Sequence, residues 1–432
     1  MEISYLYKIF EQHPFVSTDS RNCPENSIFF ALKGEKIDGN DYIDQALENG
    51  AACAIGDKKN LPDNERIIKV DNVLQTLQTL ANYHRKQMNA TVVAITGSNG
   101  KTTTKELIGA VLSSKYRTLY TQGNLNNHIG VPLTLLQLSP KHEYAIIEMG
   151  ANHIGEIREL CFIADPDYGL ITNIGKAHLE GFGSLEGVIQ AKTELYDYLR
   201  QKERPIFANR DNAILKPFFT GLSVIDYGIS SDAFIQGKMI ETSSVLALEW
   251  DKKNENEKNF IYTQLVGSYN FENVLAAICI GSYFLVEEEK INRAIKNYFP
   301  TNNRSQTKET RHNQLIIDAY NANPSSMRAA LENFFALPDS PKMVILGEML
   351  ELGDYAEEEH QAIIDLLSQN PIDQVFLIGE SFSTCSSKNP QWKIFPNTED
   401  LLDYLRLNPM KGFNILIKGS RGNQLEKTIT LL

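Results

Sequence analysis

The 432-residue chain has little cysteine, and its cysteines follow no recognisable pattern. The five cysteines are odd in number, scattered along the sequence and free of the short spacings that bind metals. Such cysteines are typical of buried free thiols in a reducing compartment. The sequence therefore argues against a secreted domain held together by disulfides.

Long apolar runs are also missing. The most apolar later segment, 274–286, is interrupted by Gly281, Ser282 and Tyr283, and it is shorter than the roughly 20 residues that span a bilayer. The first residues, MEISYLYKIFEQHP, lack the basic and apolar regions of a secretory signal. We therefore expect a soluble, cytoplasmic protein without a membrane span.

The chain also lacks an excess of positive charge. The chain has 42 Lys and Arg against 54 Asp and Glu, which gives a net charge of −12. This balance argues against nucleic acid or an anionic membrane as a partner, so local positive charge must bind any anionic substrate. The 42% hydrophobic and 22% charged content is typical of a globular protein, and the length predicts about three domains.

The most informative segment is the glycine-framed turn in VVAITGSNGKTTTKE, residues 92–106. Its β-branched run predicts a buried strand, and the pattern after Lys101 predicts a helix. Gly97 and Gly100 allow backbone N–H groups to turn toward an anion at the positive end of that helix. The loop is two residues shorter than the common phosphate-loop pattern, and an ordinary glycine-rich turn is the alternative. A lysine and threonines at this point nevertheless favour a nucleotide-phosphate site with Mg²⁺.

Two further apolar runs, 144–150 and 168–175, predict buried strands that lead into polar residues. The first carries Glu148, and His178 follows the second. Ligands of an open parallel sheet bind outside the carboxyl ends of its strands. Glu148 is therefore a candidate Mg²⁺ ligand, and His178 a ligand or water-mediated neighbour of a second metal ion. Helix capping or a core polar contact is the alternative for each residue taken alone.

Other segments carry groups that suit polar substrates. The amide-rich segment TQGNLNNHIGVP at 121–132 fits an amide-bearing substrate, although asparagine-rich loops are often only turns. In TDSR at 18–21, the guanidinium of Arg21 suits a pyrophosphate or carboxylate, with a surface ion pair as the alternative. Asn270 and Asn273 lie one helical turn apart and share a face that could present amides to a base.

A new alternation of strands and helices begins after the polar junction at 301–306, and it predicts another parallel sheet. Its expected strands again end in polar clusters, at 318–323, 347–351 and 418–421. We therefore predict an α/β protein whose domains occupy 1–88, 89–299 and 300–432.

These motifs together closely resemble the Mur ligase family of peptidoglycan synthesis. The resemblance extends from TDSR to the carboxyl end, through GSNGKTTTKE, GNLNNHIGVP, EMGANHIGEI, NIGKAHLEGFGS, AKTE, DAYNANPSSM, GEMLELG and LIKGSRGNQLE. The short phosphate loop and the surroundings of Lys192 are shared with folylpolyglutamate synthases and identify only the superfamily. DAYNANPSSM and GEMLELG indicate the family member that adds D-alanyl-D-alanine.

The resemblance implies three domains: a small α/β domain that binds the UDP moiety, a central P-loop ATPase with a mostly parallel sheet, and a Rossmann-like carboxyl domain. The last closes over the nucleotide and binds the dipeptide. The implied reaction adds D-Ala-D-Ala to UDP-N-acetylmuramoyl-tripeptide through an acyl phosphate, at the expense of ATP. A monomer is expected. A sister ligase that adds one amino acid, a folate-type ligase and a non-catalytic ATP-binding scaffold are the alternatives.

The resemblance also assigns residues by their place in the motifs. It implies that ATP contacts Gly97, Ser98, Asn99, Gly100, Lys101, Thr102, Thr103, Asn270, Asn273, Arg304 and Asp318. Two Mg²⁺ sites are implied, one held by Thr102 and Glu148 and the other by His178. Lys192 matches a lysine that the family carries as a carbamate, which is an anionic metal ligand.

Catalysis is implied for Lys101, Glu148, His178, Lys192 and Arg304. The implied substrate contacts fall into three groups: Ser20 and Arg21 for the UDP portion; Asn124, Asn126 and Asn127 for the muramoyl-peptide; and Asn321, Asn323 and Ser325 for the dipeptide.

Overall fold

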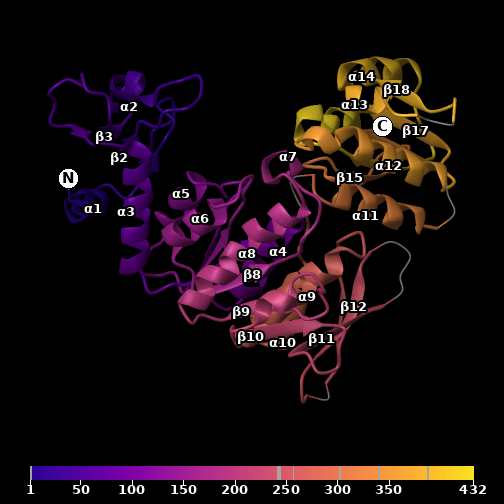
Figure 1. The fold of residues 1–432 in the computed structure, drawn as a ribbon, viewed down its shortest axis with the longest axis horizontal. Helices are drawn as coiled ribbons and strands as arrows, with labels where there is room; N and C mark the ends of the chain where they lie inside the picture. The colour runs from indigo at the N-terminus through magenta and orange to yellow at the C-terminus, as the bar shows by residue number, and fades with distance from the viewer. Residues whose placement is uncertain (1, 241–244, 256, 301–302, 339–340, 387–388) are drawn as a thin grey trace.

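The chain is described by a computed structural model that covers residues 2–240, 245–255, 257–300, 303–338, 341–386 and 389–432. Within these residues, three β-sheets follow one another along the sequence, and each lies at the centre of a separate body (Figure 1). The expected three-domain α/β fold is confirmed. Thr301 and Asn302 of the predicted junction lie outside the described residues. Among the described helices, none is long and apolar enough to cross a membrane.

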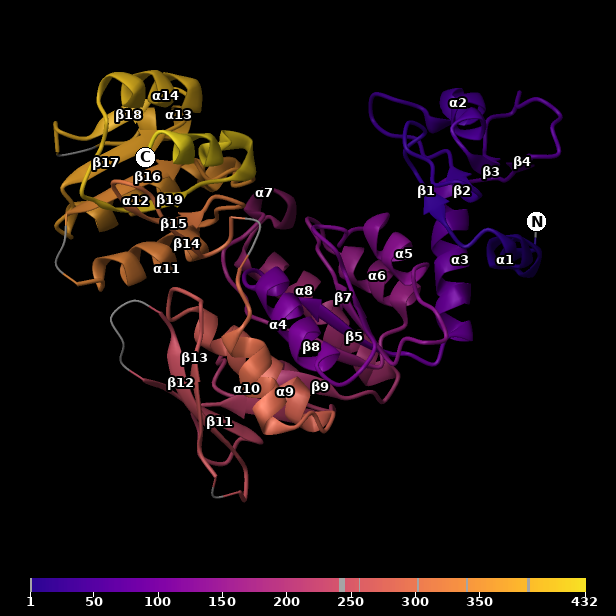
Figure 2. The ribbon, with the colours of Figure 1, turned by 180° about the vertical axis from the view of Figure 1, so that it is seen from behind.

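The N-terminal body is built on a four-stranded sheet. Its elements are α1 (Ile3–Gln12), β1 (Val16–Ser17), β2 (Ser27–Phe30), η1 (Gly39–Tyr42), α2 (Ile43–Glu48), β3 (Ala51–Gly56), β4 (Ile67–Lys69) and α3 (Val73–Gln87). The strands lie in sequence order and all pair in parallel. Helix α3 stands between this body and the central one (Figure 2), so it joins the two.

The central body is built on a nine-stranded sheet that is parallel except at one end. Its strands are β5 (Thr91–Thr96), β6 (Thr118–Tyr120), β7 (Tyr144–Glu148), β8 (Tyr168–Ile171), β9 (Ile206–Asn209), β10 (Val224–Gly228), β11 (Ile235–Ile240), β12 (Ala247–Lys252) and β13 (Asn259–Tyr262). They lie in the order β13-β12-β11-β10-β9-β8-β5-β7-β6, and only β12 forms antiparallel pairs, with β11 and β13.

Helices cover both faces of the central sheet. One face carries α4 (Lys101–Ser113), α9 (Asn270–Tyr283) and α10 (Glu288–Lys296), and the other carries α5 (Gly130–Leu135), α6 (Glu156–Ala164) and α8 (Leu185–Gln201). In β5, Val93 and Ile95 belong to the core on the face that α4, α9 and α10 cover. Val92 and Ala94 belong to the core on the opposite face, which α5, α6 and α8 cover. Because successive side chains of a strand point to opposite faces, burial on both sides requires the unbroken apolar run that precedes the glycine-rich loop.

The strand predicted over 168–175 is shorter than expected. Strand β8 ends at Ile171, and the next residues turn toward the glycine-rich loop. The Thr172 hydroxyl donates to the Asn99 carbonyl at 2.7 Å, and the Asn99 N–H donates to the Asn173 side chain at 3.0 Å. Thr172 and Asn173, which were predicted to belong to the strand, therefore support the glycine-rich loop.

The C-terminal body is built on a six-stranded sheet in the order β14-β15-β19-β16-β17-β18, parallel except for the edge pair β14–β15. Its strands are β14 (Gln306–Glu309), β15 (Gln314–Asp318), β16 (Lys342–Gly347), β17 (Gln374–Ile378), β18 (Lys393–Phe395) and β19 (Asn414–Lys418). Its helices are α11 (Pro324–Phe335), η3 (Gly353–Tyr355), α12 (Ala356–Ser368), α13 (Glu380–Ser383), α14 (Thr398–Leu407), η4 (Arg421–Asn423) and η5 (Leu425–Thr430).

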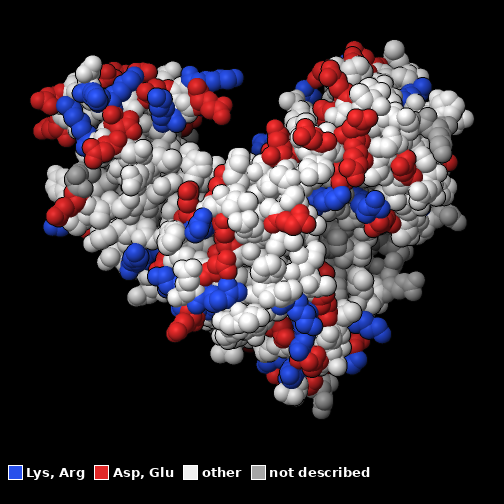
Figure 3. All heavy atoms as spheres, viewed as in Figure 1, with Lys and Arg blue, Asp and Glu red and all other residues white. Residues whose placement is uncertain are grey.

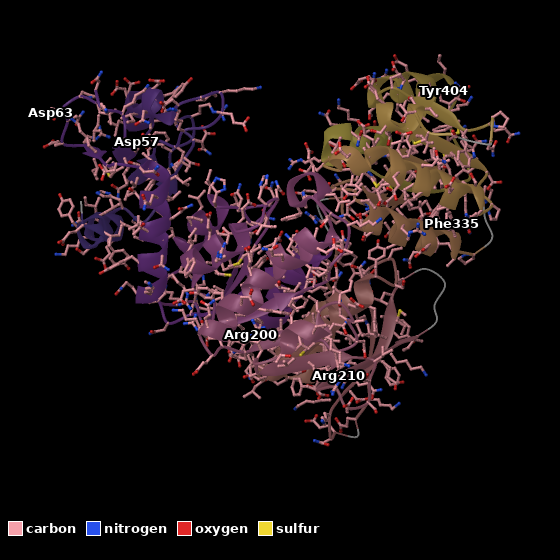
Figure 4. The ribbon with its side chains drawn as sticks, viewed as in Figure 1. Asp57, Asp63, Arg200, Arg210, Phe335 and Tyr404 are labelled. Carbon is pink, nitrogen blue, oxygen red and sulfur yellow. The ribbon has the colours of Figure 1, made fainter. Side chains whose placement is uncertain are left out.

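Side chains fill the space between helix and sheet in this body (Figure 4). Tyr404 on α14 packs edge-on against Phe376 of β17, with ring centroids 5.5 Å apart. On the face drawn in Figure 3, acidic and basic side chains are interspersed, and a hollow opens between the N-terminal and C-terminal bodies. Recognition of an anion by this face would therefore depend on particular side chains.

Candidate active site

A cavity of about 600 Å³ lies at the carboxyl ends of the central strands and is closed on one side by the C-terminal body. It brings together most of the predicted site residues, which come from segments far apart in the sequence. These are Ser98, Asn99, Gly100, Lys101, Thr102, Thr103, Asn124, Asn126, Asn127, Glu148, His178, Asn270, Asn273, Arg304, Asp318, Asn321, Asn323 and Ser325.

Four predicted residues do not line this cavity. Gly97 directly precedes the lining residue Ser98, and Lys192 contacts the lining residue Ala151. Ser20 and Arg21 lie in the N-terminal body between β1 and β2. Ser20 donates to the Gln45 side chain at 2.8 Å. Arg21 is exposed and pairs with Asp19 at 2.8 Å, so in this structure it forms the surface ion pair that the sequence left as its alternative.

The glycine-rich loop needs its glycines for steric reasons. Gly97 and Gly100 have φ angles of 143° and 78°, which side-chain-bearing residues rarely adopt. A Cβ atom on Gly97 would lie 2.1 Å from the Thr172 hydroxyl oxygen. On Gly100 it would lie 2.4 Å from a side-chain oxygen of Asn273. The loop is thus tightly enclosed, with α4 beginning directly after it.

Lys101 is folded back onto this loop. Its ammonium donates to the carbonyl oxygens of Gly97 at 2.6 Å and Ser98 at 3.1 Å. Burial lowers the pKa of Lys101 to about 8, while Glu148 opposes this shift and Arg304 adds to it. A bound anion would favour the protonated form, so Lys101 is suited to contact phosphate.

Glu148 lies at the end of β7 and has one engaged and one free oxygen. Its Oε1 accepts hydrogen bonds from Thr102 Oγ1 at 3.2 Å and Asn126 Nδ2 at 2.8 Å. Its Oε2 is buried without a hydrogen-bond partner. A threonine hydroxyl beside a carboxylate with a free oxygen is a donor set that fits Mg²⁺.

No group of three or more His, Cys, Asp or Glu side chains gathers at metal-binding distance among the described residues. This sparse donor set also fits Mg²⁺, which proteins usually bind through one or two carboxylates together with substrate phosphates and water. The Thr102 and Glu148 pair therefore has the composition expected of a nucleotide-dependent cation site.

Lys105 is a charged site residue that the sequence analysis did not single out. Its buried ammonium lies 3.9 Å from Glu148 Oε2 and 3.7 Å from Glu106 Oε1. Glu106 in turn accepts a hydrogen bond from the Tyr298 hydroxyl at 2.6 Å. The sequence contains a signal for Lys105: it follows Lys101 by four residues, and residues four apart share one face of a helix.

Lys192 is buried inside α8 rather than exposed on its surface, with 1% of its surface accessible. Its Nζ lies 3.3 Å from the Ala151 carbonyl oxygen and 5.1 Å from the centre of the Phe182 ring. Burial lowers its pKa well below the usual value, and the charge of Lys101 adds to the effect. The neutral amine favoured here is the form that reacts with CO₂ to give a carbamate.

His178 precedes the short helix α7 (Leu179–Phe182) and lines the cavity. Its Nδ1 lies 2.5 Å from Glu351 Oε2 in the C-terminal body, although the ring N–H is not aligned as a regular hydrogen bond. The interaction with His178 lowers the pKa of Glu351. The carboxylate therefore stays charged at neutral pH.

The asparagines predicted to share a helix face do so. Asn273 Nδ2 donates to Asn270 Oδ1 at 3.0 Å, and Asn273 Oδ1 accepts from the Thr104 hydroxyl at 3.0 Å. Asn270 Nδ2 donates to the Val266 carbonyl at 2.8 Å. The two amides are therefore held in fixed orientations beside the loop.

Arg304 stacks on the ring of Tyr320, with 3.7 Å between the guanidinium carbon and the ring centroid. Its Nε is buried without a hydrogen-bond partner. Asp318 forms an ion pair with Lys418 at the ends of β15 and β19. Tyr320 and Lys418 also line the cavity. The sequence placed both in polar clusters at strand ends but assigned them no role, because stacking and cross-strand pairing appear only once the sheet is formed.

The residues predicted near the dipeptide lie at the start of α11 and contact the central body. Asn323 Nδ2 donates to Asn99 Oδ1 at 2.8 Å, and the Lys176 N–H donates to the Ser325 hydroxyl at 3.0 Å. Asn321 joins them on the cavity wall. The C-terminal body thus meets the glycine-rich loop directly.

Three family models match the chain in sequence order. They are described as Mur ligase family, catalytic domain, at residues 13–85; Mur ligase middle domain, at 95–281; and Mur ligase, glutamate ligase domain, at 303–421. Among curated relatives, the chain is 35% identical over 431 residues to the UDP-N-acetylmuramoyl-tripeptide–D-alanyl-D-alanine ligase of Bacillus subtilis, covering 96% of this chain and 92% of the relative. The identity to the Escherichia coli protein of the same name is 34%, with 96% and 93% covered.

Solved structures resemble the whole chain. A crystal structure of MurF from Acinetobacter baumannii matches with a TM-score of 0.86 and 30% identity, covering 96% of this chain and 92% of the other. A MurF ligase from Thermotoga maritima, solved in complex with ADP, matches with a TM-score of 0.85 and 26% identity, covering 97% of both chains.

The lowered pKa of Lys101 predicts how nucleotide affinity depends on pH. Below pH 8 the ammonium is charged before binding, whereas above pH 8 binding must first take up a proton. The Kd of a non-hydrolysable ATP analogue should therefore rise above pH 8, by up to about tenfold per pH unit. Calorimetry across pH 7 to 9.5 would measure this Kd.

Lys101→Arg is the control, because its guanidinium stays charged over this range. The rise of the Kd above pH 8 should disappear in this variant. The same pH dependence in both proteins would contradict the assignment.

Proposed function

This chain belongs to the Mur ligase family, and we propose on that basis that it joins D-alanyl-D-alanine to UDP-N-acetylmuramoyl-tripeptide with consumption of ATP. The product is UDP-N-acetylmuramoyl-pentapeptide, with ADP and phosphate. The observation that carries the proposal is the cavity in which the phosphate loop, Glu148 and His178 meet the start of α11. This arrangement can hold a nucleotide and an amine substrate on opposite sides of one space.

The reaction proceeds in two displacements. An oxygen of the tripeptide's terminal carboxylate attacks the γ-phosphorus of ATP, the bond to the bridging oxygen breaks, and ADP leaves. The dipeptide's amine then attacks the acyl carbon to give a tetrahedral intermediate, from which phosphate departs while the nitrogen loses a proton. The first step joins two anions, so positive charge and fixed orientation are the main requirements.

The residues of the cavity meet these requirements in different ways. The loop from Gly97 to Thr103 cradles the phosphates, and Lys101 moves from its loop carbonyls to the phosphate oxygens. Arg304 adds charge from the C-terminal body. Asn270 and Asn273 contact the adenine, and Asp318 contacts the ribose.

Two cation sites belong to the proposal. Thr102 and Glu148 would hold one Mg²⁺, and His178 with carbamylated Lys192 would hold the second. The cations neutralise phosphate charge when bound. The Glu148 oxygen without a hydrogen-bond partner supports the first assignment, and the burial of Lys192, which lowers the pKa of its amine, supports the second.

The substrate contacts and domain limits complete the proposal. Residues 1–88 bind the UDP portion, 89–299 bind ATP, and 300–432 bind the dipeptide and cover the nucleotide. The contacts are Ser20 and Arg21 for UDP, Asn124, Asn126 and Asn127 for the muramoyl-peptide, and Asn321, Asn323 and Ser325 for the dipeptide. A monomer in the cytoplasm is the proposed working form.

Phosphate release tests the reaction directly. We expect release from ATP only when UDP-N-acetylmuramoyl-tripeptide and D-Ala-D-Ala are both present, because the second displacement frees the phosphate. Tripeptides ending in diaminopimelate or in lysine should be compared, with D-Ala and L-amino acids as control amines. Release with a shorter UDP precursor and a single amino acid would indicate a sister ligase. No release with any pair would contradict an enzymatic role.

Lys192→Ala tests the carbamate. Turnover should fall at least about a hundredfold, because an anionic metal ligand is lost, and short carboxylic acids at high concentration should restore part of it. Lys202→Ala is the matched control, because Lys202 is exposed at the end of the same helix. Near-normal turnover of Lys192→Ala would contradict the assignment.

A further inference from the structure

The pair formed by His178 and Glu351 joins two bodies of the molecule. His178 follows β8 in the central body, and Glu351 follows β16 in the C-terminal body. The side chain of His178 is 21% exposed and that of Glu351 is 50% exposed, so the imidazole is the more enclosed partner. Both ribbon views place α7, which begins directly after His178, against the C-terminal body (Figures 1 and 2).

The backbone on each side holds the two residues in unusual conformations. His178 has a φ of 51° and Glu351 a φ of 62°, in the left-handed region that residues other than glycine seldom adopt. The Glu180 N–H donates to the Glu351 carbonyl at 3.1 Å, which ties the two turns together. Such conformations persist only where the surroundings hold them, and they are common at functional sites.

Two other contacts cross the same boundary nearby. Lys176 forms an ion pair with Glu359 of α12. The Tyr355 hydroxyl donates to the Gly183 carbonyl at 3.1 Å. The turn that carries His178 is therefore held against the C-terminal body at several points, and docking alone does not require a carboxylate at the imidazole.

The chemistry of the contact is specific to one ring nitrogen. Glu351 lies at Nδ1, which leaves Nε2 as the nitrogen without a carboxylate. When a histidine binds a metal through one nitrogen, a carboxylate at the other fixes its tautomer and ring orientation and makes it a better ligand.

We infer that Glu351 is a positioning residue that holds His178 in the orientation and tautomer required to bind a divalent cation. The inference rests on the proposed role of His178 as a metal ligand. It follows that the second cation site is complete only while the C-terminal body is docked, because the ligand and its support come from different bodies.

Glu351→Gln tests the inference, because it removes the charge and keeps the size of the side chain. Mn²⁺ can replace Mg²⁺ in paramagnetic resonance titrations with a non-hydrolysable ATP analogue. We expect Glu351→Gln to weaken one Mn²⁺ site by about 10–100-fold. The ¹⁵N shifts of the His178 ring, assigned by their loss in His178→Gln, should change as the tautomer balance shifts. The KM for ATP should change less than about threefold, while kcat falls with the weakened site.

Glu359→Gln is the matched control, because it breaks the neighbouring ion pair without touching His178. It should leave the Mn²⁺ titration and the His178 ring shifts unchanged. Equal losses in Glu351→Gln and Glu359→Gln would overturn the inference, because the contact would then serve docking alone. Normal Mn²⁺ binding in Glu351→Gln, with a site lost in His178→Gln, would overturn the inference and leave the proposed function intact. Normal Mn²⁺ binding in His178→Gln would overturn the metal role of His178 itself.

Discussion

The buried carboxylate of Glu148 is the group on which the rest of the site depends. It lies at the buried end of β7, accepts hydrogen bonds from Thr102 and Asn126, and has Lys105 at 3.9 Å from its second oxygen. Two unit charges about 4 Å apart interact by about 4 kcal/mol at an effective dielectric constant near 20, whereas an exposed pair contributes about 0–1 kcal/mol. A carboxylate held in this way has a fixed orientation, as a cation site requires.

The second constraint is that the cavity is built from two bodies. The central body supplies the glycine-rich loop, Glu148 and His178, and the C-terminal body supplies Arg304 and the start of α11. A protein with a net charge of −12 has no general attraction for a nucleotide and an anionic peptide. Its cations must therefore be placed locally, and docking of the C-terminal body brings some of them in.

Much of this site could be predicted from the sequence, because its main residues follow buried strands. Glu148 and the loop before Lys101 lie directly at strand ends, where apolar runs and glycines mark them. The alternating pattern likewise predicted the parallel sheets. The sequence predicted that this strand would extend to residue 175, but β8 ends at Ile171. Beyond Ile171, side chains form hydrogen bonds with the glycine-rich loop instead.

Other features depend on contacts that no local pattern contains. The burial of Lys192 requires α8 to pack against the loop that carries Ala151. The pairing of His178 with Glu351 joins residues 173 positions apart on different bodies (351 − 178). Stacking of Arg304 on Tyr320 likewise forms only when β15 brings the ring to the junction. Sequence position therefore predicts most of the groups that line the cavity, and tertiary packing decides their orientations.

The most direct test of the account is the path of one oxygen atom. The tripeptide substrate would be labelled with ¹⁸O in its terminal carboxylate, and the phosphate released with D-Ala-D-Ala would be analysed by mass spectrometry. The account predicts one ¹⁸O in each released phosphate, because the carboxylate oxygen that attacks the γ-phosphorus leaves with it. Unlabelled phosphate would mean that water attacks ATP, and it would contradict the acyl-phosphate mechanism.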